Sequence, residues 1–250
     1  MYVKNLVSGE LRLMAGDADN PSSNIATGFD RRDEHIFFVT NQRQGAAELA
    51  ISSLDPEPKK TFVRSRGNWD ITHFVLSPDR KRGAFIANEA GISRLYLFDT
   101  AKLAMKQVNK VPLGIISGLR FSPDSRKLGM TLNSARSPND AFVLSLGNKP
   151  LAARNLTRWT FSEVGGLDTD KFAEPIPIRY PSPAEAEDED FNIPAFVYLP
   201  PGKGPFPVII HVHGGPENQF RPRFNSEFQM WIDELGVAVV APNIRGSLGY

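Results

Sequence analysis

The residues of this chain that are best suited to chemistry gather in one stretch, PFPVIIHVHGGPENQF, at positions 205–220. His211 and His213 could hold a metal or move a proton, but histidines at i and i+2 with no nearby third ligand argue against a metal site. Gly214 and Gly215 suit another task, because glycine lets the backbone approach a developing negative oxygen with no side chain between them. We take this stretch as the candidate site and expect neither a metal nor a cofactor there.

The segments around this stretch predict a parallel sheet with a crossover helix. Residues 208–213 form an uninterrupted apolar run, which is typical of a strand buried on both faces. Residues 237–243 form a second such run. Between them, residues 224–236 have helical spacing of the apolar side chains and end in a glycine, a natural helix stop. The apolar positions are Phe224, Phe228, Trp231, Ile232 and Leu235, followed by Gly236.

Two further runs, 174–183 and 192–201, predict the strands of a hairpin. The acidic run Glu185–Asp190 joins them. Such a run could bind a cation or a substrate amine, although a solvated hairpin loop is the simpler interpretation.

The first two thirds of the chain contain a repeat of about 45 residues. HFVLSPDRKRGAFIAN at 73–88 matches GLRFSPDSRKLGMTLN at 118–133, and GFDRRDEHIFFVTN at 28–41 is a weaker copy. Ser-Pro-Asp favours a tight turn, and the runs beside it are short and rich in Val, Ile, Phe and Leu. About four strands per repeat at this period is typical of a propeller blade. A β-sandwich with accidental self-similarity is the alternative.

Composition excludes several other classes of protein. The chain has 250 residues, a net charge of +1, 41% hydrophobic residues and no cysteine. Its basic residues are scattered, so we expect no nucleic-acid partner. The apolar runs are too short for a membrane span, and no signal peptide is visible. Without cysteine there is no disulfide or thiol chemistry, and the compartment stays open between cytoplasmic and periplasmic or secreted.

The strand, glycine loop and helix resemble the HGG motif of α/β-hydrolases, in which the loop after the third strand supplies a backbone N–H to the oxyanion hole. The chain as a whole resembles the prolyl oligopeptidase family of serine peptidases. The resemblance rests on the Ser-Pro-Asp blades, a Pro-rich passage, a hairpin, HVHGGP and ELGVAVVAPNIRGSLGY. The dipeptidyl and acylaminoacyl peptidase branch is the nearer match, because its members carry HGGP followed by N-x-RGS-x-GY, here Asn243 to Tyr250.

The resemblance implies a fold class of all-β propeller blades followed by the N-terminal part of an α/β-hydrolase domain. Residues 1–165 would be a partial propeller, with about three blades and part of another, and residues 166–250 an incomplete hydrolase domain. The acidic run departs from the family, which usually has a short Asp-Gly turn there.

The resemblance also implies roles for individual residues. Gly214 and Gly215 would form the oxyanion-hole loop. His213 and Pro216 would support that loop, His213 as a hydrogen-bonded anchor rather than as a base. Arg245 would pair with a carboxylate beneath the site, or else be a solvated turn residue. His211 is interpreted as a core histidine, and Tyr250 as a residue with no assignable substrate role.

The chain lacks the rest of the family's catalytic machinery. The family's nucleophile lies in a G-x-S-x-G elbow beyond the RGS-x-GY segment, followed by the aspartate and the histidine. Gly246-Ser247-Leu248-Gly249 does not have that form. We therefore interpret the chain as a fragment that begins within a blade and ends within a sheet, and we expect it to be inactive and marginally stable by itself.

The parent protein is expected to be a serine peptidase that hydrolyses short peptides through an acyl-enzyme, with the propeller restricting substrate size. Short peptides are then its partners, and homo-oligomerisation is left open. Two alternatives remain: a non-catalytic propeller interaction module with a degenerate hydrolase domain, and a carboxylesterase on the same fold.

Overall fold

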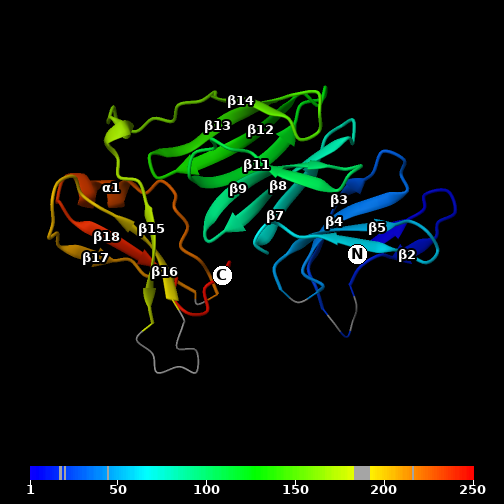
Figure 1. The fold of residues 1–250 in the computed structure, drawn as a ribbon, viewed down its shortest axis with the longest axis horizontal. Helices are drawn as coiled ribbons and strands as arrows, with labels where there is room; N and C mark the ends of the chain where they lie inside the picture. Colours follow the sequence, from blue (N-terminus) through cyan, green and yellow to red (C-terminus); the bar gives the residue numbers. More distant parts are fainter. Residues whose placement is uncertain (17–18, 20, 44, 183–191, 216) are drawn as a thin grey trace.

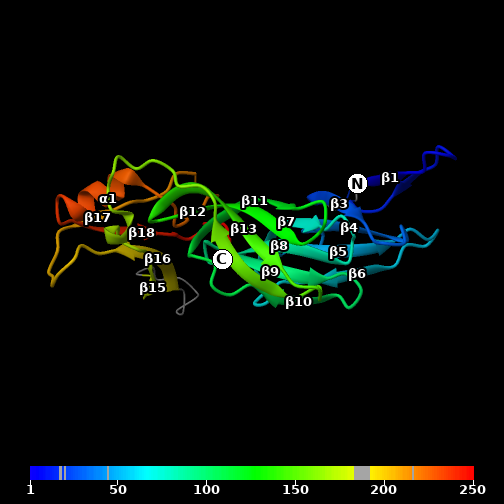
Figure 2. The ribbon, with the colours of Figure 1, turned by 90° about the horizontal axis from the view of Figure 1, so that it is seen from above.

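A computed structural model describes residues 1–16, 19, 21–43, 45–182, 192–215 and 217–250. The chain forms three four-stranded antiparallel sheets, a separate hairpin and a fourth, mixed sheet. Figure 1 shows the three antiparallel sheets side by side and the mixed sheet at one end of the array. The view from above in Figure 2 shows an elongated molecule, and the described sheets form an open array rather than a closed ring.

Each repeat predicted from the sequence corresponds to one antiparallel sheet whose strands follow chain order. The first sheet contains β3 (Asn24–Phe29), β4 (His35–Thr40), β5 (Glu48–Ser53) and β6 (Lys60–Val63). The second contains β7 (Asp70–Leu76), β8 (Arg82–Glu89), β9 (Ile92–Asp99) and β10 (Ala104–Gln107). The third contains β11 (Gly114–Phe121), β12 (Lys127–Ser134), β13 (Ser137–Leu146) and β14 (Ala153–Arg158). The short antiparallel strands expected from the repeat are thus confirmed.

The Ser-Pro-Asp segments form the predicted turns. The Ser77 hydroxyl donates to Asp79 at 2.7 Å, and the Arg80 amide donates to the Ser77 carbonyl at 2.8 Å. The same two contacts recur 45 residues later, from Ser122 to Asp124 and from Ser125 to Ser122. Such side-chain and backbone bonds close a tight turn and return the chain for an antiparallel strand.

The sheets are joined by apolar cores between them. One core packs β4 and β5 against β7, β8 and β9, with Phe37, Phe74 and Phe98 in mutual ring contact. A second core packs β8 and β9 against β11, β12 and β13. Neither face of the middle sheet could be buried by one repeat alone, so neighbouring repeats stabilise one another.

The chain before β3 forms a hairpin of β1 (Tyr2–Lys4) and β2 (Leu11–Leu13), which pairs Tyr2 with Leu13. Residues 2–14 resemble residues 96–108 in sequence, and this hairpin pairs in the same way as β9 and β10. Met14 and Ala15, which follow β2, pack against β4 and β5.

The fourth sheet has the order β15-β16-β18-β17, formed by β15 (Ile176–Pro181), β16 (Asn192–Tyr198), β17 (Val208–Ile210) and β18 (Ala238–Pro242). The predicted hairpin is confirmed, since β15 and β16 pair antiparallel. The predicted parallel pair is confirmed as well, since β17 pairs parallel with β18 and α1 (Ser226–Asp233) crosses between them. A 3-10 helix, η1 (Thr169–Lys171), lies between β14 and this sheet.

The prediction of a strand buried on both faces at 208–213 is wrong. Only Val208–Ile210 is extended as β17, and this strand forms an edge of the described sheet. Val208 is 54% exposed and Ile210 is 66% exposed. The apolar run predicts a strand that could be buried, but burial requires neighbours on both sides, and here β17 pairs with β18 alone.

The helix α1 buries one face. Asn225 caps its first turn by accepting from the amides of Glu227 and Phe228, and Phe228 and Ile232 are buried. Leu235 was expected on this face but lies beyond the helix and is 61% exposed. Gly236 has φ +64°, the left-handed conformation that ends the helix as expected.

None of the helices described here is both long enough and apolar enough to cross a membrane.

Candidate functional site

The loop that leaves β17 carries the two glycines of the predicted site. Gly214 and Gly215 are exposed, and Gly215 has φ +109°, a conformation that residues with a side chain rarely adopt. A Cβ at Gly215 would lie 3.1 Å from the Cβ of Asn218. Among the described residues, the amide N–H groups of Gly214 and Gly215 have no hydrogen-bond acceptor. The loop therefore presents two free backbone donors beside the end of a strand.

His213 fastens this loop to the segment after β18. Its Nε2 atom lies 2.8 Å from the Ser247 hydroxyl, and its Nδ1 atom lies 3.1 Å from the Gly214 carbonyl. Both ring nitrogens of His213 are thus engaged in local contacts. Leu248 adds a second tie, because its amide donates to the Asn218 carbonyl at 2.9 Å.

Asn243 holds the far side of the loop from a buried position. Its side chain is 1% exposed and pairs with the backbone of Phe220 in both directions. The Phe220 amide donates to Asn243 Oδ1 at 2.7 Å, and Asn243 Nδ2 donates to the Phe220 carbonyl at 3.1 Å. Because the Asn243 side chain pairs with both the backbone N–H and the backbone C=O of Phe220, it fixes the position of this part of the chain.

His211 belongs to the apolar core beneath the loop, as expected. Its ring meets Phe228 at 5.0 Å and Phe220 at 5.8 Å between centroids, both edge to face. Its backbone amide donates to the Val240 carbonyl and so extends the pairing of β17 with β18. This residue contacts aromatic rings and takes no part in the polar surface of the loop.

The RGSLGY segment, residues 245–250, packs against Asn243 and Gln219. The Tyr250 hydroxyl accepts from Asn243 Nδ2 at 2.8 Å, and partial burial raises the pKa of the Tyr250 phenol. Gly249 has φ +78°, and a Cβ there would lie 2.7 Å from Asn88 Nδ2 and 2.7 Å from Gln219 Nε2. Glycine is favoured at this position by its positive φ and by the close approach of Asn88 from β8 and Gln219 from the loop.

The remaining predicted residues are less informative. Arg245 Nη2 donates to the Ser182 hydroxyl at 3.4 Å. Pro216 and the acidic run Glu185–Asp190 lie outside the described residues.

The sequence did not predict the side chains that connect the loop to the second and third antiparallel sheets. Asn88 Nδ2 donates to Gln219 Oε1 at 2.9 Å, and the Phe224 amide donates to Asn133 Oδ1 at 2.6 Å. Arg221 lies between them and donates to the Gly91 carbonyl and to the Ser93 hydroxyl, each at 2.9 Å. Burial lowers the pKa of the Arg221 guanidinium. The recurrence of asparagine at 88 and 133 was the available signal, although it was visible only as part of the repeat.

The only group of three potential metal-ligand side chains in the described part of the chain lies elsewhere, at Asp30, Glu34 and His35. The His35 ring already pairs with the Asp30 carboxylate at 3.0 Å. The basic side chains of Arg31, Arg80 and Lys81 line the same cavity and oppose cation binding.

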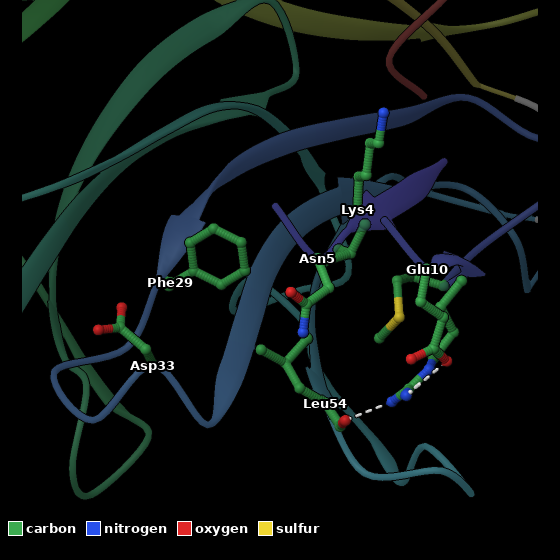
Figure 3. A pocket seen from close by; sticks show the side chains of 9 residues that line it. Lys4, Asn5, Glu10, Phe29, Asp33 and Leu54 are labelled. Carbon is green, nitrogen blue, oxygen red and sulfur yellow. Dashed lines mark hydrogen bonds and ion pairs between the residues drawn. The ribbon is translucent and has the colours of Figure 1, made fainter. Parts of the chain in front are cut away.

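A separate cavity of about 320 Å³ lies beside the hairpin of β1 and β2. Its lining is shown in Figure 3. Arg12 donates to the Leu54 carbonyl at 2.5 Å and to Glu10 at 3.0 Å, the contacts drawn there as dashed lines. Arg12, one of the charged groups that line the cavity, is thus already paired inside the fold.

The overall fold resembles that of part of known peptidases. Prolyl oligopeptidase B from Galerina marginata superposes with a TM-score of 0.77 at 16% identity, over 98% of this chain and 34% of that one. Acylaminoacyl peptidase from Pyrococcus horikoshii superposes with a TM-score of 0.65 at 21% identity, over 100% of this chain and 36% of that one. At these identities the likeness shows that the chain has the fold of the corresponding part of these enzymes.

Two curated relatives are similar in sequence. One is the uncharacterized peptidase YuxL of Bacillus subtilis, 27% identical over 54% of this chain and 19% of its own length. The other is dipeptidyl peptidase family member 6 of Caenorhabditis elegans, 21% identical over 93% of this chain and 33% of its own length. The chain thus spans between about a fifth and a third of these relatives. No family model matches the chain.

Proposed function

We propose that this chain is part of a serine peptidase of the prolyl oligopeptidase family that hydrolyses short peptides through an acyl-enzyme. In this proposal residues 1–165 supply the blades of a β-propeller, and residues 166–250 begin the α/β-hydrolase domain. The peptidases among the sequence relatives and the prolyl oligopeptidase fold support it. The dipeptidyl and acylaminoacyl branch is supported by the HGGP and N-x-RGS-x-GY motifs together.

One observation carries the proposal. Two glycine amides that have no acceptor among the described residues lie exposed where the loop leaves a parallel strand, and the residues on both sides of them are held by His213 and Asn243. Such donors can stabilise the negative oxygen that forms when a serine hydroxyl attacks a peptide carbonyl. Because they are fixed before the reaction, they cost no reorganisation in the transition state.

The chemistry divides between this chain and the rest of the protein. Gly214 and Gly215 hold the carbonyl oxygen, whereas the serine, the aspartate and the histidine of the triad come from outside residues 1–250. His213 and Arg245 support the loop, and Pro216 restricts its backbone. The blades admit only short, unstructured peptides.

Fluorophosphonate labelling of the whole gene product tests this division. We expect one labelled serine, located outside residues 1–250, and loss of peptidyl-anilide hydrolysis in proportion to labelling. A labelled serine within residues 1–250 would show that the assignment of the nucleophile is wrong. An absence of labelling together with an absence of hydrolysis would favour a non-catalytic propeller module. Hydrolysis of a matched ester with no hydrolysis of the anilide would favour a carboxylesterase.

A further inference from the structure

The same asparagine recurs in each of the three repeats. Counted from the first residue of the second strand, it is the seventh position each time: Asn41 from His35, Asn88 from Arg82 and Asn133 from Lys127. The repeat by itself gives no reason for an asparagine there, because the position lies within one residue of the end of the strand, away from the turn.

Two of the three asparagines contact the segment that follows the glycine loop. Asn88 is buried and reaches Gln219, whereas Asn133 is half-buried and accepts from the Phe224 amide. Equivalent positions of adjacent blades therefore hold the two ends of residues 219–224. Asn41, by contrast, is exposed and accepts from the Ser23 amide within its own repeat at 2.8 Å.

Arg221 fixes the middle of this segment to the turn between β8 and β9. Its two donated bonds end on Gly91 and Ser93. Gly91 has φ +86°, and a Cβ there would lie 3.2 Å from the Phe196 ring and 3.3 Å from the Phe220 carbonyl. The blade turn and the segment are therefore packed in contact, with no room for a side chain between them.

The segment is short and continuous with the site. Gln219 and Phe220 follow Gly215 by four and five residues, and Asn243 holds Phe220 from the other side. A shift of residues 219–224 therefore moves the backbone that carries the free amides. Displacing a preorganised donor by about 1 Å reduces rate roughly 100-fold.

We propose that Asn88, Asn133 and Arg221 are positioning residues through which the blades set the place of the Gly214 and Gly215 amides. The effect of these residues on catalysis rests on the proposed function. Their effect on the position of the loop rests on the contacts alone. The blades then have a second task besides limiting substrate size: they orient part of the catalytic machinery.

The test compares the variants Asn88→Ala and Asn133→Ala with Asn41→Ala in the whole gene product. Asn41→Ala is the matched control, because it removes the same side chain at the equivalent position of a blade that does not contact the loop. Two readouts are followed: the steady-state hydrolysis of a short peptidyl anilide, and amide hydrogen exchange in peptides covering residues 208–218.

We expect kcat to fall roughly 5- to 20-fold in Asn88→Ala and Asn133→Ala, as the loss of one anchoring hydrogen bond predicts. KM should stay within about twofold, because the anchors do not contact substrate. Hydrogen exchange over residues 208–218 should accelerate in these two variants and stay unchanged in Asn41→Ala. Asn133→Asp keeps the acceptor for the Phe224 amide and should restore both readouts.

Three outcomes would overturn the inference. Asn88→Ala and Asn133→Ala could match Asn41→Ala in exchange and in kcat, or all three could lose stability with no selective change in the loop. A folded Asn133→Asp that behaves like Asn133→Ala would show that the hydrogen bond is not the cause. A protein that hydrolyses no peptide would refute the proposed function alone, because exchange still decides whether the asparagines hold the loop.

Discussion

At the scale of single residues, conformation decides which glycine of the loop can be replaced. Gly214 has open space around a Cβ, whereas Gly215 combines φ +109° with a close approach to Asn218. An added methyl at Gly215 therefore strains the backbone and pushes against the chain that follows. Both effects act on the same peptide groups that we propose bind the carbonyl oxygen.

We expect Gly215→Ala to lower kcat/KM by roughly tenfold or more, because displaced oxyanion donors lose transition-state stabilisation. Gly202→Ala is the control, since Gly202 has nearly the same φ of +106° and open space but lies outside the loop. It should share the backbone strain, roughly 1 kcal/mol or more, and retain activity. Equal activity losses in the two variants would mean that strain alone, and not the site, explains the effect.

At the scale of elements, a buried carboxylate joins two strands and the segment that follows them. Asp140 in β13 is buried, and it binds Arg158 in β14 and residues of the chain that follows β14. Its carboxylate accepts from Arg158 at 2.5 Å, Thr160 at 2.8 Å, Ser137 at 2.7 Å and the Ser162 amide at 2.9 Å. Burial alone would raise the pKa of Asp140, but these donors outweigh it and lower the pKa to about 2.

This pKa predicts a pH-dependent contribution to stability. The folded pKa lies below the ordinary value of 3.8, so the contribution is fully present above about pH 4 and disappears as the pH falls toward 2. Asp140→Asn should therefore lower Tm at pH 7 by several degrees, and the difference from the original protein should shrink near pH 2. Thermal unfolding of both proteins between pH 7 and pH 2 measures this difference in Tm. Asp55→Asn, at an exposed carboxyl, should show little change, and a pH-independent difference for Asp140→Asn would contradict the assignment.

At the scale of the whole molecule, the antiparallel sheets and the mixed sheet share a core. Ile92 in β9 and Ala135, which follows β12, pack with Phe196, Phe228 and other buried residues of the mixed sheet and α1. The view in Figure 1 places the β8 and β9 ends toward that sheet, with the C-terminal end of the chain between them. Such a shared core couples the stability of the two parts.

We expect Ile92→Ala to destabilise both parts together by about 2–5 kcal/mol, as for other large-to-small changes in a packed core. Hydrogen exchange in the whole gene product should accelerate in β8 and β9 and also in β16 and β18. Ile25→Ala, at a residue that is 58% exposed, should have little effect in either part. Acceleration confined to β8 and β9 would show that the two parts open independently.

The sequence by itself determined the local features of this protein. Turn residues, strand runs, the hairpin, the crossover helix and the glycine loop all follow from periodicity and from residues close together in the chain. The tertiary structure alone decided three others: the edge position of β17, the pairing of Asn243 with Phe220, and the use of Asn88 and Asn133 as anchors. Those anchors join residues 131 and 91 positions apart. A repeat can show that an asparagine recurs, but only packing decides which copies meet the loop.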